Sequence, residues 1–193
     1  MRVPILFSTA LTLFSTFTII AVSAVKSPAI ELQDGTVYFA QPPRLVKATT
    51  TYNTIGIVGA TYYFTITLPD NAGEPLQTIT INQRQGVDYV NFDLKDSFAL
   101  GETATSKQQR LEIKNTNIDQ KAKTVTLTFD PPVSPGQTIT IALKPVQNPL
   151  VEGVYLFGVT AYPRGEKAHG QFLGFGRLNF YGYDSESFFF PYP

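Results

Sequence analysis

Lys123-Thr-Val-Thr-Leu-Thr-Phe129 is the stretch of this sequence that decides the fold, because its apolar residues recur at every second position. Val125, Leu127 and Phe129 share one side and threonines occupy the other, which is the pattern of a strand with one face buried. Thr138 to Leu143 repeats the alternation. Branched and aromatic side chains of this kind suit a pleated surface.

Outward from this stretch, further runs with the same character give about ten expected strands. They are Ile30 to Ala40, Leu45 to Thr51, Tyr62 to Leu68, Leu76 to Asn82, Val87 to Asp93, Arg110 to Lys114, Lys123 to Phe129, Thr138 to Leu143, Gly153 to Tyr162 and Phe172 to Tyr181. Their number and spacing are typical of a sandwich or a barrel. We predict a single all-β domain, an immunoglobulin-like antiparallel β-sandwich.

Turn residues separate these runs. Pro69 to Gly73 predicts a hairpin between the strands on either side, and the three prolines of Asp130 to Gly136 cannot donate to a central ladder. Gly153 to Tyr162 is apolar on both sides, which predicts a central strand covered on both faces. The exception is the charged segment Leu94 to Ala122, where we expect Asp96 to Gln109 to form a loop or a short helix.

The first 24 residues have the features of an export signal. Arg2 supplies the positive start, an apolar stretch runs to Val22, and Val22-Ser23-Ala24 fits the small-residue cleavage pattern. We predict a signal peptide over 1–24 and one domain over 25–193. An uncleaved membrane anchor is the alternative, since Val3 to Val25 is about long enough to cross a bilayer.

Composition excludes several classes of function. Loss of Arg2 leaves 14 basic residues against 15 acidic ones, so nothing favours a nucleic-acid partner. The chain has no Cys, which removes disulfides, thiol nucleophiles, lipid attachment through a thiol and Cys-based metal sites. We expect no cofactor, and no membrane span after signal cleavage.

A family resemblance rests on Asp130-Pro-Pro-Val-Ser-Pro-Gly-Gln-Thr138 and Gly170-Gln-Phe-Leu-Gly-Phe-Gly-Arg-Leu178, together with Tyr63 to Leu76 and Leu143 to Ala161. On these motifs the chain resembles the cyanobacterial family of exported proteins called domain of unknown function 2808. The resemblance implies a secreted or periplasmic β domain. It brings no catalytic residues to carry over.

His169 is the only imidazole in the chain and sits beside a glycine. A lone histidine is a poor catalyst without an orienting carboxylate and a nucleophile, and a poor metal site without further ligands. Ser134, Ser185 and Ser187 lie in Pro-rich or acidic surroundings, without the strand-turn-helix context of a nucleophile elbow. We therefore predict a solvated loop histidine and no catalytic, cofactor or metal residues.

Two groups of acidic residues are candidates for catalysis or calcium binding. The first is Asp88, Asp93 and Asp96 with Asn91, and the second is Asp70, Asn71 and Glu74. Neither matches the spacing of a calcium loop. Asp88 and Asp93 are expected on opposite faces of a strand, so we interpret these residues as strand-end and turn solvation.

Aromatic residues gather near the end of the chain and form the predicted partner surface. They are Tyr181, Tyr183, Phe188, Phe189, Phe190 and Tyr192. The alternative is that Phe188 to Phe190 closes the core and ties down the terminus. Exposed aromatics can stack on sugar rings or anchor a protein partner.

The functional prediction from sequence is a non-enzymatic binding or structural module of the periplasm or cell surface. Its partner would be an envelope protein or a polysaccharide. A polysaccharide-binding module and an unrecognised hydrolase are the alternatives.

Overall fold

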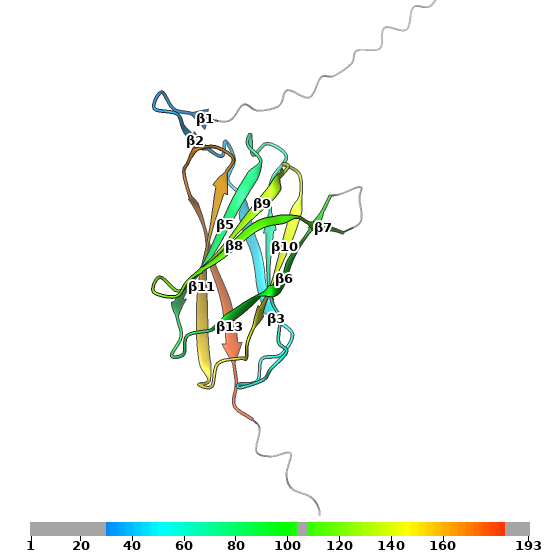
Figure 1. Ribbon diagram of the computed structural model, residues 1–193, viewed down its shortest axis with the longest axis vertical. Helices are drawn as coiled ribbons and strands as arrows, with labels where there is room; N and C mark the ends of the chain where they lie inside the picture. The colour runs from blue at the N-terminus through cyan, green and yellow to red at the C-terminus, as the bar shows by residue number, and fades with distance from the viewer. Residues whose placement is uncertain (1–29, 104–107, 184–193) are drawn as a thin grey trace, which may run out of the picture.

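The computed structural model describes residues 30–103 and 108–183. The regular secondary structure within these ranges consists of strands, with no helix (Figure 1). The signal peptide predicted over 1–24 lies outside the described residues. The strands are β1 (Ile30–Glu31), β2 (Thr36–Tyr38), β3 (Arg44–Thr50), β4 (Tyr62–Thr67), β5 (Leu76–Gln85), β6 (Phe92–Glu102), β7 (Gln109–Leu111), β8 (Ile113–Asp119), β9 (Thr124–Val133), β10 (Thr138–Pro145), β11 (Gly153–Pro163), β12 (Lys167–Ala168) and β13 (Gln171–Phe180).

Two five-stranded antiparallel sheets form the two layers of the sandwich. Their strand orders are β3-β4-β10-β6-β7 and β13-β11-β5-β9-β8. An immunoglobulin-like sandwich places its first, second, fifth and fourth strands in one sheet and its third, sixth and seventh in the other. The first sheet reproduces this pattern with β3, β4, β10 and β6, and the second with β5, β11 and β13. The strands β7 to β9 are an insertion between β6, the fourth strand of the pattern, and β10, the fifth. The predicted fold class is confirmed.

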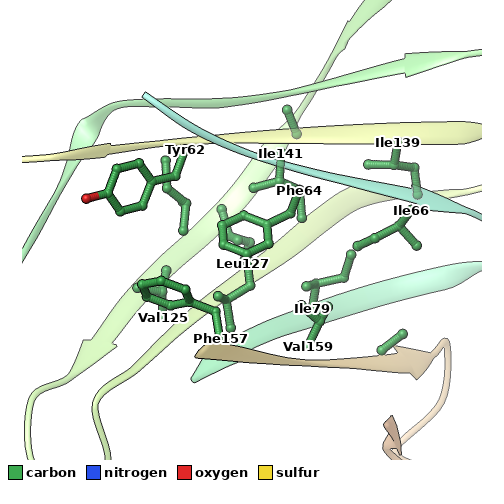
Figure 2. Packing of buried hydrophobic residues seen from close by; sticks show 14 of the residues in the cluster. Tyr62, Phe64, Ile66, Ile79, Val125, Leu127, Ile139, Ile141, Phe157 and Val159 are labelled. Carbon is green, nitrogen blue, oxygen red and sulfur yellow. The ribbon is translucent and has the colours of Figure 1, made fainter. Parts of the chain in front are cut away.

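The alternation of the sequence is reproduced in the burial of the strands. Val125, Leu127 and Phe129 of β9 are buried, whereas the threonines between them are half-buried on the outer side. The core lies between the two sheets, where apolar side chains from facing strands interdigitate (Figure 2). Figure 2 labels Tyr62, Phe64, Ile66, Ile139 and Ile141 from one sheet and Ile79, Val125, Leu127, Phe157 and Val159 from the other.

The two edges of the sandwich are closed differently. At one edge β13 packs against β3, and the close approach depends on Gly176. A Cβ there would lie 2.7 Å from the Cβ of Ala48 and 2.8 Å from the ring of Phe64. At the other edge the chain crosses from one sheet to the other between β7 and β8, through Glu112.

A small third sheet lies at one end of the sandwich (Figure 1). This sheet consists of the β1–β2 hairpin and the short strand β12, which pairs with β2 in parallel. Phe39, which follows β2, is buried in the main core, and the N–H of Ala40 donates to the carbonyl of Ala72. These contacts fix the N-terminal part of the described chain to the sandwich.

Three expectations about local structure were wrong. The turn at Pro69 to Gly73 does not make a hairpin, because β4 and β5 lie in different sheets. Most of the segment Leu94 to Ala122 is strand, and Asp96–Glu102 belongs to β6. The run Val87 to Asp93 is largely a connection, since β6 begins only at Phe92.

The prediction for β11 was right in one respect and wrong in another. The strand is central, with β13 on one side and β5 on the other. Its second face, however, is covered by no third layer in the described part of the chain. Val154 and Leu156 on that face are half-buried among neighbouring side chains, and the face is the outer surface of the sandwich.

Candidate functional site

His169 lies at the end of the sandwich where β2 and β12 meet. Its ring stacks on that of Tyr38, with centroids 4.5 Å apart, and its backbone N–H donates to the carbonyl of Val37. Within the described ranges its ring has no hydrogen bond to a serine or a carboxylate. The residue is exposed, and its contacts are with Val37 and Tyr38 of β2 in the small third sheet.

The acidic residues considered above each have a separate structural task. The carboxylate of Asp88 accepts from the N–H groups of Leu150 and Val151, at 2.7 and 3.0 Å. Asp93 accepts from the N–H of Lys95 at 3.0 Å, and Asp96 lies 4.0 Å from the ammonium of Lys144.

No cluster of three or more potential metal ligands occurs among the residues that the structure describes. Asp70 lies in the predicted turn, with its carboxylate against Gly136. Ser134 is exposed in the connection before β10, and Ser185 and Ser187 lie outside the described residues. Asp70 and Asp88 therefore lie in connections, whereas Asp93 and Asp96 belong to β6.

The predicted aromatic partner surface is described only in part. Tyr181 and Tyr183 are exposed by 56% and 66%. Tyr181 is held through its backbone, since its N–H donates to Asn53 and its carbonyl accepts from Ile55. Phe188, Phe189, Phe190 and Tyr192 lie outside the described residues, so this surface stays a prediction. Within the described chain it is Phe180 that is buried at the end of β13.

A pair of aromatic residues that sequence reasoning missed lies on the outer face of the sheet containing β13. Phe172 and Phe175 are 49% and 53% exposed, and their rings meet edge to face with centroids 5.1 Å apart. Residues three apart on a regular strand point to opposite faces. The two rings share a face because β13 is irregular between them.

The irregularity is a β-bulge at Leu173 and Gly174. Phe175 pairs with Gly158, Gly174 with Val159 and Phe172 with Thr160, so Leu173 has no partner of its own on β11. Gly174 has φ +117°, a backbone conformation that side chains disfavour. A glycine inside a strand pattern can mark such a bulge and was the one sequence signal available here.

Gly158 of β11 lies directly beneath the aromatic pair. A Cβ at this position would lie 3.3 Å from Phe172 Cε2, 3.5 Å from Arg84 Cγ and 3.6 Å from Phe175 Cε1. Three side chains from two different strands therefore converge over a residue that has no side chain. This convergence holds both rings close to the sheet with their remaining surface open to solvent.

A shallow groove continues from the pair across the same face, with a volume of about 410 Å³. It is lined by Thr80, Asn82, Arg84, Ala122, Thr124, Gly158, Thr160, Tyr162 and Phe172. The lining combines two aromatic rings with hydroxyl, amide and guanidinium groups and contains no carboxylate. The side-chain Oδ1 of Asn82 is buried and has no hydrogen-bond partner within the described ranges.

Another hollow, of about 500 Å³, lies beside β6, β7 and β8 and is lined by Leu94, Phe98 and Arg110 among others. Its aromatic ring is already covered, because the guanidinium of Arg110 lies 5.4 Å from the centroid of Phe98. The Phe172–Phe175 pair has no such cover. We therefore take the outer face of β5, β11 and β13 as the candidate site and call it the aromatic face.

No helix in the described ranges is long and apolar enough to span a membrane. No curated protein matches the sequence significantly.

Several solved structures resemble this chain at low similarity. The collagen-binding domain of a Staphylococcus aureus adhesin is 13% identical, with a TM-score of 0.38 and coverage of 70% of this chain and 97% of that one. An uncharacterised Nocardia farcinica protein with an immunoglobulin-like fold is 14% identical, with a TM-score of 0.41 and coverage of 69% and 96%. A group B streptococcus pilus 2b backbone protein is 13% identical, with a TM-score of 0.44 and coverage of 69% and 56%.

The chain spans about half the length of several of the structures that it matches. At these identities and TM-scores the likenesses carry no information about function.

The sequence itself is matched by a family model over residues 36–180, from β2 to the end of β13. That range contains the whole sandwich and the aromatic face. The chain belongs to the family described as protein of unknown function (DUF2808).

Proposed function

We propose that this protein is an exported, non-enzymatic binding module that holds a polysaccharide chain on its aromatic face. The observation that carries the proposal is the exposed pair of Phe172 and Phe175 over Gly158. Large exposed apolar surface on a folded domain marks a binding site when it is contiguous and rimmed by polar groups. This pair meets both conditions.

The chemistry of the face suits sugars. A sugar ring presents C–H groups on its two faces and hydroxyl groups around its rim. The C–H face packs on an aromatic ring, while the rim hydroxyls can reach the Thr, Asn and Arg groups of the groove. A flat sheet face also places these groups on rigid strands, which holds their spacing fixed.

Export is part of the proposal and rests on the signal peptide predicted over 1–24. Cleavage after Ala24 would leave a mature protein over 25–193, located in the periplasm or at the cell surface, where envelope polysaccharides are found. N-terminal sequencing of the protein recovered from native cells tests this part. A chain beginning at Val25 supports it, and a chain that keeps Met1 or Arg2 contradicts it.

A second candidate is a protein partner bound at the opposite end of the sandwich from β1 and β2. Exposed apolar side chains gather in the connections there and after β13: Tyr52, Val58, Val87, Val146, Leu150, Tyr181 and Tyr183. The predicted partner surface of Tyr181, Tyr183, Phe188, Phe189, Phe190 and Tyr192 begins at this end. An envelope protein is the partner that such a surface would fit.

The proposal is tested by affinity electrophoresis of the protein comprising residues 25–193 in gels containing dextran, chitosan, dextran sulfate or polygalacturonate. We expect retardation by at least one polysaccharide and an affinity about tenfold lower in the Phe172→Ala/Phe175→Ala variant. Val46→Ala is the control, because it removes an exposed apolar side chain from β3 in the other sheet, outside both candidate surfaces. Equal retardation of the double variant and the parent protein would contradict the proposal.

The same gels separate the alternatives. Loss of retardation in Tyr181→Ala, with Phe172→Ala/Phe175→Ala unaffected, would favour the terminal surface. A hydrolase would instead show activity against ester, peptide or glycoside panels that disappears in His169→Ala.

A further inference from the structure

The charges around the aromatic face are unevenly distributed. Arg84 of β5 and Arg177 of β13 lie on either side of β11, at the level of Leu156, which pairs with Arg177 and with Gln85. The stem of Arg84 lies over Gly158 beside the two phenylalanine rings. Two guanidinium groups thus flank the exposed aromatic pair.

Neither arginine is neutralised by a carboxylate within the described ranges. The ion pairs found there are Lys114 with Asp130, on β8 and β9 of the same sheet, and Lys144 with Asp96, on β10 and β6 of the other sheet. The guanidinium of Arg84 makes no hydrogen bond to described residues. Arg177 donates from Nε to Asn179 Oδ1 at 3.1 Å, which leaves its terminal nitrogens available.

An acidic group, Glu152, lines a neighbouring hollow together with Arg177, Asn179 and Tyr181. One of its carboxylate oxygens accepts from the N–H of Gly182 at 3.1 Å, and within the described ranges it forms no ion pair with Arg177. The whole chain carries 15 basic and 15 acidic residues. The basic character of the groove is therefore local and not a consequence of net charge.

We propose that the polysaccharide held on the aromatic face is anionic, with carboxylate or sulfate groups bound by Arg84 and Arg177. This inference rests on the proposed function. A guanidinium group matches the planar or branched oxygens of these anions with paired N–H donors. The sugar ring stacks on Phe172 and Phe175, and its charged substituent reaches an arginine beside them. The groove beside Arg84 contains no carboxylate that would repel such a chain, whereas Arg177 shares its hollow with Glu152.

Matched polymers test the inference through affinity electrophoresis and calorimetry of the protein comprising residues 25–193. Dextran sulfate differs from dextran only in its sulfate groups. Methyl-esterified polygalacturonate differs from the free polymer only in that its carboxyl groups are neutral esters instead of ionised carboxylates. We expect at least one anionic member to bind about tenfold or more tightly than its neutral partner. The logarithm of its affinity should fall linearly with the logarithm of the salt concentration. Whichever pair shows the difference identifies sulfate or carboxylate as the recognised group.

Single substitutions localise the effect. Arg84→Gln should weaken binding of the anionic polymer about tenfold and that of the neutral one much less, because the neutral polymer loses only hydrogen bonds to this side chain. Arg84→Lys should recover only part of the loss, since it keeps the charge without the paired donors. Arg44→Gln is the matched control, because it removes an equally exposed arginine from the other sheet. Near-UV circular dichroism of each variant verifies the fold.

The outcomes separate the two proposals. Equal affinity for neutral and anionic members, insensitive to salt, overturns this inference and leaves the proposed function standing. Absence of binding to every polysaccharide overturns both. An equal loss in Arg44→Gln and Arg84→Gln shows non-specific attraction and overturns the inference. Tighter binding of oligo-deoxythymidylate than of any polysaccharide also overturns it, in favour of a single-stranded nucleic acid.

Discussion

The phenol of Tyr62 donates a hydrogen bond to the side-chain carbonyl of Asn148 at 2.9 Å, and neither residue is exposed to solvent. The amide nitrogen of Asn148 donates to the backbone carbonyls of Tyr52 and Thr54, at 3.0 and 2.8 Å. One buried side chain thus joins β4 to the connections that follow β3 and β10. These connections form one end of the sandwich.

Asn148→Ala is expected to lower the free energy of unfolding by roughly 3 kcal/mol, because it leaves the buried phenol and the Thr54 carbonyl without these bonds and leaves the Tyr52 carbonyl with only the Thr50 hydroxyl. Tyr62→Phe removes only one of the three bonds and should cost about 1–2 kcal/mol. Urea unfolding of both single variants and the double variant measures these values. Additive effects in the double variant would contradict the direct coupling.

Stability should fall in alkaline solution. Burial, with the neighbouring phenol of Tyr155 adding to it, raises the pKa of Tyr62 well above its usual value. The folded state therefore holds its proton more tightly than the unfolded state does. The stabilisation is fully present below the unfolded pKa, about 10, and is lost as the pH rises above it.

The Tyr62→Phe variant supplies the control for this pH dependence. Between pH 9 and 11 its free energy of unfolding should decline less steeply than that of the parent protein, because one titrating group is gone. Burial also raises the pKa of Tyr155 and of Tyr89, so part of the decline remains. Identical slopes in the two proteins would show that Tyr62 does not contribute.

Gly176→Ala should destabilise the sandwich by about 2 kcal/mol. The new Cβ would collide with the Cβ of Ala48 and with the Phe64 ring, and the edge between β13 and β3 would have to open. Gly101→Ala is the control in another strand, where a Cβ would meet the flexible ends of Leu111 and Gln137. Thermal unfolding compares the two, and an equal or larger loss at Gly101 would refute the explanation.

Gly158→Val should impair binding while leaving the fold intact. Valine suits a strand, but its methyl groups would occupy the space in which Phe172, Phe175 and Arg84 converge. We expect a melting temperature within a few degrees of the parent protein and a loss of polysaccharide affinity of about tenfold. Affinity electrophoresis measures the loss, and unchanged retardation would disconnect Gly158 from the site.

Sequence alternation was sufficient to predict the central strands. The runs at β4, β9 and β10 show period-two burial over most of their length because one face of each is packed in the core, although Thr65 and Ala142 on the other face are buried too. Turn residues showed where the chain reverses but not which sheet it enters next, and this is why Pro69 to Gly73 was misread as a hairpin. Only the start of β8 falls within the predicted run Arg110 to Lys114, because β8 is an edge strand with few apolar residues.

The candidate site was harder to predict for physical reasons. Strict alternation assigns Phe172 and Phe175 to opposite faces, and only the bulge beside Gly174 brings them together. The role of Asn148 depends on a partner 86 residues away in the chain. Both features arise from tertiary structure, whereas the predicted terminal aromatic cluster was visible in the sequence because its members are adjacent.

The measurement that tests the central claim most directly is NMR mapping of the protein comprising residues 25–193 during titration with short oligosaccharides of dextran, dextran sulfate and galacturonate. The account predicts that at least one of them shifts the backbone amide signals of Gly158, Phe172 and Phe175, with smaller changes on the opposite sheet. Signals on the aromatic face that stay unchanged with all of them, or changes centred on Tyr181 and Tyr183, would contradict it.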